Sequence, residues 1–117
     1  MAVGIAKSTA NLSSYLGSDA NGYSYVGSNG NKLNNATSTA YGSTYGNSVV
    51  IGVAMDLDNG TLTFYRNGVS QGTAFSGLSG TFYAAEGTTN NGDASTANFG
   101  ATAFSFSPPA GFNAGLY

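Results

Sequence analysis

The sequence predicts an all-β fold, an antiparallel β-sandwich, and three observations point to it. Apolar residues alternate from Val49 to Leu57, two Asn-Gly pairs follow at hairpin spacing, and no window sustains a period of 3.6 residues. Many short strands bounded by Gly, Asn and Pro are typical of a sandwich or barrel. We expect one such domain over residues 1–117.

The central strands are the best-defined elements. From residue 49 the odd positions are apolar and the even ones begin apolar, which predicts a strand buried on both faces that ends in acidic residues. Asn59-Gly60 then leads into a strand at 61–66, and Asn67-Gly68 leads into another at 69–75. Both central residues of a type I′ turn need a positive φ, which Asn and Gly tolerate best. We therefore expect a three-stranded antiparallel meander.

Shorter strands are expected on either side of the meander, each bounded by Gly, Asn or Pro. They lie at residues 2–7, 23–26, 81–85, 96–100 and 103–107. Stretches rich in Gly, Asn, Ser and Thr are expected to be loops, at 17–22, 27–48 and 86–95. The phenylalanines in the predicted strands are expected in the core: Phe64, Phe75, Phe82, Phe99, Phe104 and Phe106.

The composition excludes several classes of function. The chain has 117 residues, only 7% of them charged, and neither Cys nor His, so it cannot build a Ser-His or Cys-His nucleophile or a thiolate metal site. Three cations are too few for nucleic-acid binding. We expect no signal peptide and no membrane insertion, because the opening residues lack a basic start followed by an apolar stretch and no apolar run approaches the length of a membrane span. We expect no cofactor and no metal.

The predicted strands carry little protection against pairing at their edges. Natural sheets shield exposed edges with Lys, Pro or bulges, yet residues 2–106 contain three cations and no proline. We hypothesise that an open edge or face pairs with a neighbouring subunit or with preceding sequence, which makes a homo-oligomer the expected state.

The residues also resemble a known family. The run from Val50 to Gly68, VIGVAMDLDNGTLTFYRNG, resembles the central signature of SPRY domains. Weaker pieces follow the family's order at Val3-Gly4-Ile5-Ala6, Leu16-Gly17-Ser18-Asp19, Asn98-Phe99-Gly100 and Pro109-Ala110-Gly111-Phe112. Ser48-Val49 stands where the family usually has Gly-Asp.

The resemblance implies a concanavalin-A-like sandwich that binds rather than catalyses. It also implies strands ahead of Val3 that this chain does not contain, so we expect another chain or upstream sequence to complete the sandwich. Low charge and abundant Asn, Gly, Ser and Thr are similar to phage fibre and decoration proteins. We accordingly expect a non-enzymatic binding or structural module of a phage or bacterial surface assembly, located on a virion or an extracellular surface.

Candidate ligand-binding residues combine aromatic rings with short amide donors, a set that suits neutral sugars. Expected partners are virion subunits, further copies of the chain, or a host-surface glycan or receptor; a lectin-like domain is the alternative function. The candidates lie in or beside three predicted loops: Tyr23, Tyr25, Asn29, Asn31, Asn34, Tyr41, Tyr45, Asn90, Asn91 and Asp93.

Two carboxylates leave a remote enzymatic alternative. Asp56 and Asp58 are two apart at an expected strand end, which would put both on one face, as a glycoside hydrolase pair requires. The alternative interpretation is that they form the solvated shoulder of the Asn59-Gly60 turn. The same residues lack the distal Glu of a calcium-binding loop.

Overall fold

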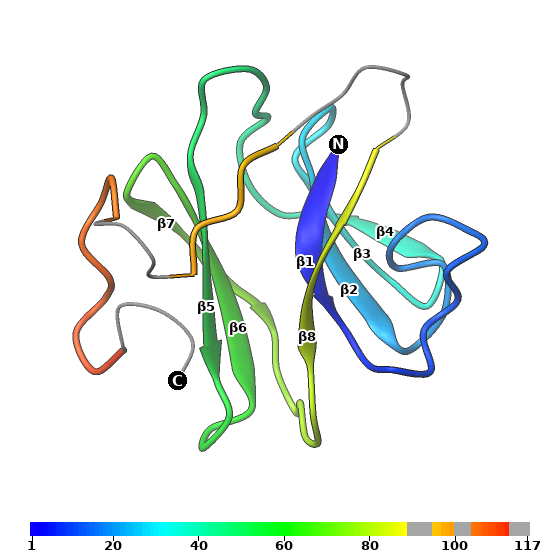
Figure 1. Cartoon of the computed structure of the whole chain (residues 1–117). Coiled ribbons are helices and arrows are strands. Elements are labelled where there is room, and N and C mark those ends of the chain that lie inside the picture. Colours follow the sequence, from blue (N-terminus) through cyan, green and yellow to red (C-terminus); the bar gives the residue numbers. More distant parts are fainter. Residues whose placement is uncertain (89–94, 100–103, 113–117) are drawn as a thin grey trace.

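A computed structural model describes residues 1–88, 95–99 and 104–112. In these ranges every regular element is a β-strand, and the strands form two antiparallel sheets that enclose the core (Figure 1). The strands are β1 (Ala2–Ala6), β2 (Gly22–Val26), β3 (Asn31–Asn34), β4 (Thr37–Ala40), β5 (Ile51–Asp56), β6 (Thr61–Arg66), β7 (Val69–Phe75) and β8 (Tyr83–Gly87). The expected all-β sandwich is confirmed.

The larger sheet has five strands in the order β4-β3-β2-β1-β8. Side chains alternate between the two faces of a strand, so the paired residues Val3–Tyr25 and Ile5–Tyr23 share one face of this sheet. This is the inner face, because Ile5 and Tyr25 belong to the core. β8 begins at Tyr83, two residues later than the expected strand at 81–85.

The smaller sheet has the order β5-β6-β7 and is the expected meander. Asn67 and Gly68 both adopt positive φ, 47° and 81°, which confirms the two-residue turn between β6 and β7. The expected two-residue turn at Asn59-Gly60 is wrong, because β5 ends at Asp56 and residues 57–60 all lie in the connection to β6. Only Gly60 has a positive φ there, 67°.

A further hairpin, β3–β4, lies inside the stretch that the sequence predicts to be a loop, residues 27–48. Its two-residue turn consists of Asn35 and Ala36, whose φ values are 52° and 59°. Positive φ at Ala36 is unfavourable for an L-residue, and the turn is held by neighbouring backbone. Asn35 N–H donates to the carbonyl of Asp19 at 2.9 Å, and Ala36 N–H donates to that of Gly17 at 2.8 Å.

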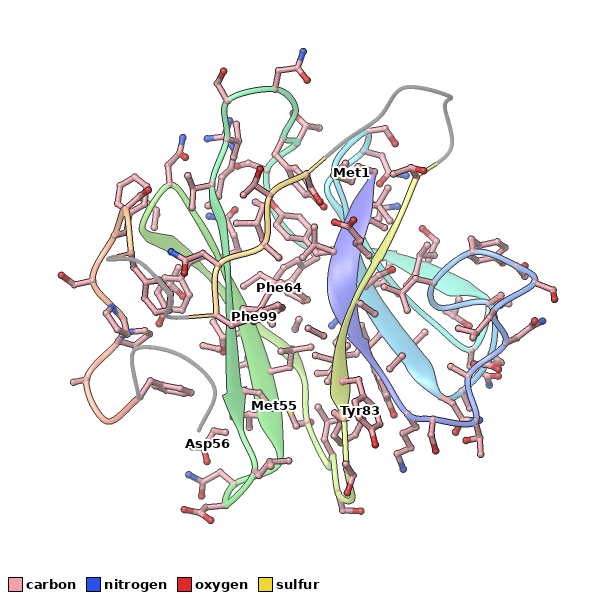
Figure 2. The ribbon with its side chains drawn as sticks, viewed as in Figure 1. Met1, Met55, Asp56, Phe64, Tyr83 and Phe99 are labelled. Atoms are coloured by element: carbon pink, nitrogen blue, oxygen red, sulfur yellow. The ribbon has the colours of Figure 1, made fainter. Side chains whose placement is uncertain are left out.

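The core lies between the sheets, with Phe64 of β6 near its centre (Figure 2). It is built from fully or nearly buried side chains of both sheets and of the β7–β8 connection, and half-buried aromatic rings complete it. The buried members are Ile5, Tyr25, Leu62, Phe64, Ala74 and Leu78. Phe75 and Phe82 pack against this cluster, as expected.

Three expectations about burial and strands are wrong. The expected burial of β5 on both faces is wrong, because 42% of Val53 is exposed. The described parts of the strands expected at 96–100 and 103–107 form no strand, and their remaining residues lie outside the described ranges. Without a ladder to place them in the core, Phe99 and Phe106 are 50% and 42% exposed.

Candidate binding surface

The tyrosines assigned to ligand binding are packed inside the sandwich or along its rim. Tyr25 is fully buried, and its hydroxyl donates to the carbonyl of Ser43. Tyr41 and Tyr45 stand edge-on to the ring of Tyr25, with centroids 5.2 and 4.8 Å away. Tyr23 packs in the same way on Phe75, at 5.0 Å. Tyr41 and Tyr45 thereby hold the segment after β4 against the core, and they remain half-buried, as does Tyr23.

The hydroxyls of the same tyrosines are used within the chain. Tyr41 donates to the carbonyl of Gly72, and Tyr45 donates to the carbonyl of Tyr25. Burial raises the pKa of Tyr25, Tyr41 and Tyr45 above the ordinary value for a phenol. The neutral form is therefore favoured, and it is the form that can donate these hydrogen bonds.

Of the described candidate asparagines, two make hydrogen bonds near β3 and β4, and one lines a pocket. Asn29 Oδ1 accepts from the backbone N–H of Asn31 at 2.9 Å and so shapes the entry to β3. Asn31 Nδ2 donates to Ser38 Oγ across the hairpin, also at 2.9 Å. Asn34 lines a pocket on the other face. The remaining candidates, Asn90, Asn91 and Asp93, lie outside the described residues.

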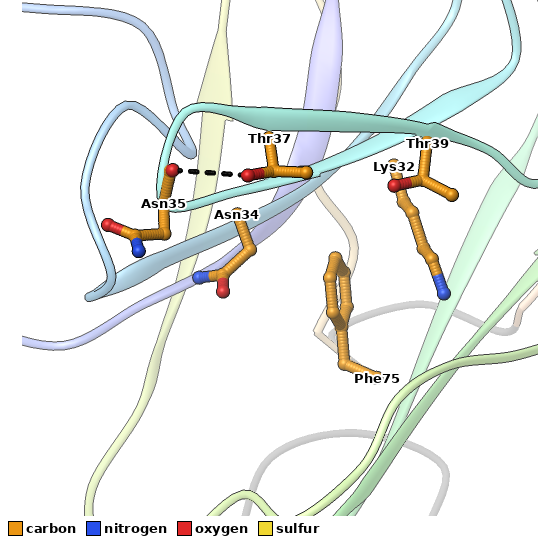
Figure 3. Close-up of a pocket in the computed structure, with 6 residues that line it drawn as sticks. All are labelled: Lys32, Asn34, Asn35, Thr37, Thr39 and Phe75. Atoms are coloured by element: carbon orange, nitrogen blue, oxygen red, sulfur yellow. Dashed lines mark hydrogen bonds between the residues drawn. The ribbon is translucent and has the colours of Figure 1, made fainter.

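This pocket lies between the inner face of the β3–β4 hairpin and Phe75 of β7 (Figure 3). Cross-strand pairing puts Lys32 beside Thr39 and Asn34 beside Thr37, so the four side chains share one face of the hairpin. With Asn35 they form one wall of a cavity of about 280 Å³, and Phe75 lies opposite them. The pocket therefore combines a cation, amides and hydroxyls with an aromatic ring.

The side chain of Lys32 is the charged group of this pocket. Its Nζ donates to the carbonyl of Ala74 at 2.7 Å and lies 5.4 Å from the ring centroid of Phe75 and 5.9 Å from that of Tyr41. An ammonium group has three donors, so the bond to Ala74 leaves two for a ligand. Lys32 is thus held in place while still able to donate.

Asn34 and Thr39 supply neutral polar atoms next to this cation. Asn34 Nδ2 donates to the carbonyls of Gly22 and Ala20, at 2.9 and 3.3 Å, which fixes the amide and leaves Oδ1 as an acceptor. In the described part of the chain, Thr39 Oγ1 makes no hydrogen bond. The pocket can consequently offer donors from Lys32, an acceptor from Asn34 and a hydroxyl from Thr39.

Of the six residues that line the pocket, sequence reasoning predicts Asn34 and misses the other five: Lys32, Asn35, Thr37, Thr39 and Phe75. The sequence predicts Phe75 in the core, which it partly joins, and marks Lys32 only as one of three cations. A sequence pattern that could have indicated the pocket is the pair Lys32 and Asn34, two positions apart. Once these residues are placed on a strand, this spacing puts both side chains on the same face.

The carboxylates considered for catalysis do not lie together on a strand. Asp56 ends β5, while Asp58 lies in the connection that follows, so the expected arrangement is wrong. Asp56 Oδ1 accepts from the backbone N–H groups of Asp58 and Asn59, and Oδ2 accepts from Asn59 Nδ2 at 2.8 Å. The side-chain bond from Asn59, followed by its backbone bond, lowers the pKa of Asp56. These contacts are those of a loop-stabilising carboxylate.

The described residues contain no group of three acidic, His or Cys side chains that could hold a metal ion. They also contain no helix long and apolar enough to cross a membrane.

Comparison with known families identifies the fold. A model of the SPRY domain matches residues 1–102. The chain belongs to the SPRY family. This confirms the resemblance of the meander to the SPRY signature, and it assigns the chain to a family of protein-binding modules.

Similar proteins include Ran-binding protein 9 of Xenopus tropicalis, which is 34% identical over 107 residues, or 91% of this SPRY chain and 20% of that protein. Ran-binding protein 10 of Danio rerio is 33% identical over the same share of the chain, which is 18% of its own length. Ran-binding protein 9 of Homo sapiens is also 33% identical, with 15% of that protein covered. The chain thus spans a fifth or less of these relatives. All three species are vertebrates, which gives the expected virion association no support.

Proposed function

We propose that this SPRY chain is a non-enzymatic protein-binding module and that the pocket beside Phe75 receives a segment of the partner. The observation that carries the proposal is the pairing of an anchored cation, Lys32, with an aromatic ring and unpaired polar atoms in one concave site. Ligand-binding pockets combine an apolar surface with a few fixed polar groups in this way.

The charge in the pocket favours a partner segment that carries a carboxylate. Lys32 is its single charged residue, and no acidic side chain lines it. An Asp or Glu side chain could accept from Lys32 Nζ while its methylene groups contact Phe75. Hydrogen bonds to charged groups contribute about 1.5–3 kcal/mol, so this contact would dominate the affinity of a short peptide.

The test is binding to a panel of capped peptides that differ only at a central Asp, Asn, Ser or Lys. We expect the Asp peptides to bind best, and we expect Lys32→Gln to weaken their binding by about tenfold or more. Lys7→Gln is the matched control, because Lys7 lies over Phe82 and does not line the pocket. Equal binding of the Asp and Lys peptides would contradict the assigned ligand chemistry.

A lectin-like function is the second candidate, and the same pocket supports it. A sugar could place C–H groups on Phe75 while its hydroxyls meet Asn34 and Thr39. A neutral glycan would be far less sensitive to Lys32→Gln and to added salt than a carboxylate ligand. Binding on a neutral glycan array that is lost in Thr39→Val and kept in Lys32→Gln would favour this candidate.

The location on a virion or an extracellular surface remains a proposal that composition alone supports. Only 7% of the residues are charged, so polar neutral side chains must solvate much of the surface. Immunogold labelling of intact particles and cells from the source would test it. Label confined to the cell interior would refute it.

A further inference from the structure

Among the described residues the two sheets have four edge strands: β4 and β8 in the larger sheet, β5 and β7 in the smaller. Three of them carry features that discourage pairing with another chain. β8 contains Glu86, β5 ends in Asp56, and β7 has an irregular register and a positive φ of 92° at Gly72. β4 has neither charge, proline nor bulge, and all four of its residues are exposed.

The register of the hairpin determines which backbone groups of β4 point outward. In a hairpin with a two-residue turn, the residues that flank the turn form a hydrogen-bonded pair, and such pairs alternate with non-hydrogen-bonded ones. Asn34–Thr37 and Lys32–Thr39 are therefore the bonded pairs. It follows that the N–H and C=O groups of Ser38 and Ala40 point away from β3. In the described residues, no strand lies on that side.

We propose that a second copy of the chain occupies this edge, with β4 paired antiparallel to β4 about a two-fold axis at Thr39. Ser38 of one copy would exchange both backbone bonds with Ala40 of the other, and Ala40 with Ser38, giving four intermolecular hydrogen bonds. The two Thr39 residues would face each other as a non-hydrogen-bonded pair. The larger sheets of the two copies would then form one continuous sheet.

Two features of this edge allow a second copy to occupy it. The outward groups consist of a donor and an acceptor on Ser38 and the same on Ala40, a set that is complementary to itself after a two-fold rotation. β4 is also uncharged, so two copies can approach without repulsion between like charges. This dimer does not depend on the peptide site, because backbone groups form it.

Because the chain has no cysteine, single cysteine variants can report the register directly. Residues in a non-hydrogen-bonded pair have Cα atoms about 4.5 Å apart, within the range that a disulfide spans. We expect Thr39→Cys to form a disulfide-linked dimer under mild oxidation. Ser38→Cys is the control, since the two Ser38 residues would lie about two positions out of register, beyond the ~7 Å limit for a disulfide.

The outcomes separate the proposed register from random contact. Efficient linkage of Thr39→Cys with little linkage of Ser38→Cys supports the two-fold at Thr39. Equal linkage of both variants, or linkage of neither, overturns it. Disulfide linkage can be measured whether or not any peptide binds. A result against the dimer is therefore distinguishable from a result against the peptide-binding site.

Sedimentation over a concentration series gives an independent test with unmodified cysteine-free chains. We expect the mass to rise from one copy to two. Ser38→Pro removes an outward N–H and keeps the bonds to β3, so it should shift the midpoint of dimer formation to at least tenfold higher concentration. Ser38→Ala, which also loses the contact with Asn31 but keeps the N–H, is the matched control. A parent chain that stays monomeric throughout the series overturns the proposal. If circular dichroism shows that Ser38→Pro does not fold, the comparison of disulfide linkage in Thr39→Cys and Ser38→Cys remains the test of the proposed dimer.

Discussion

The hydroxyl of Tyr41 accepts a hydrogen bond from the backbone N–H of Phe64 at 3.2 Å and thereby joins the two sheets. Tyr41 directly follows β4 of the larger sheet, whereas Phe64 lies on β6 in the middle of the smaller one. The same hydroxyl donates to the carbonyl of Gly72 on β7. One phenol therefore satisfies two backbone groups of the opposite sheet.

Replacing Tyr41 by Phe should destabilise the fold measurably. The change leaves the N–H of Phe64 without this partner, and an unsatisfied buried donor costs about 1–3 kcal/mol. The carbonyl of Gly72 also loses the bond but is exposed to water. Urea unfolding of the variant checks the expected loss. Tyr83→Phe is the control, because 58% of that residue is exposed. Equal stability of the two variants would show that water replaces the Tyr41 hydroxyl.

The glycines at 60 and 46 should respond oppositely to alanine. Gly60 has a φ of 67°, and an added Cβ would lie 2.6 Å from the carbonyl oxygen of Leu78, so Gly60→Ala should cost more than about 1–2 kcal/mol. Gly46 has open space around it, and Gly46→Ala should be neutral or stabilise by up to about 1 kcal/mol. Thermal unfolding of both variants measures the contrast. Similar melting temperatures would contradict the geometry of the β5–β6 connection.

Ala36→Gly should stabilise the chain, although glycine usually weakens folded structure. Ala36 holds a φ of 59° in the β3–β4 turn, a conformation that costs an L-residue about 1–2 kcal/mol. Relief of this cost should exceed the extra unfolded-state entropy of glycine, leaving a gain of up to about 1 kcal/mol. Ala10→Gly, in a turn with no positive φ, should instead reduce stability. Chemical denaturation of the two variants gives the comparison.

Stability should fall at alkaline pH because of the buried tyrosines. Burial raises the pKa of Tyr25, Tyr41 and Tyr45 in the folded chain, whereas unfolded tyrosines titrate near ~10. Their contribution is complete below pH ~10 and is lost as the pH rises, since the unfolded state then releases protons first. Urea midpoints between about pH 8 and about pH 11 should show the loss, and Tyr45→Phe should make it smaller. A midpoint independent of pH would exclude this linkage.

The meander and the hairpin show what sequence patterns can and cannot predict. Val53 and Met55 alternate with smaller residues, and Asn67-Gly68 can adopt two consecutive positive φ values, so β5, β6 and β7 were predictable. The β3–β4 hairpin gives no such signal. Its strands are mostly polar, and its turn contains Ala36, which takes a positive φ only with support from the backbone of residues 17–19.

The candidate site was harder to predict than the fold because neighbouring aromatic and amide residues have different surroundings. Tyr25 and Asn34 lie on adjacent strands and carry groups common in binding sites. Packing against Phe64 takes Tyr25 out of contact with solvent, whereas Asn34 is half-buried and lines the pocket opposite Phe75. Local sequence does not encode how far one sheet covers the other.

By itself, the sequence determined the strand class and the central meander, because period-two alternation and the Asn67-Gly68 turn act over a few neighbouring residues. The resemblance of its Val50–Gly68 run pointed to the SPRY family. The tertiary structure alone decided that four tyrosines pack the core and its rim, that Lys32 faces Phe75, and that β4 is left as an open edge. These features depend on contacts between segments far apart in the chain, such as Lys32 with Ala74, and such contacts exist only after the sheets pack together.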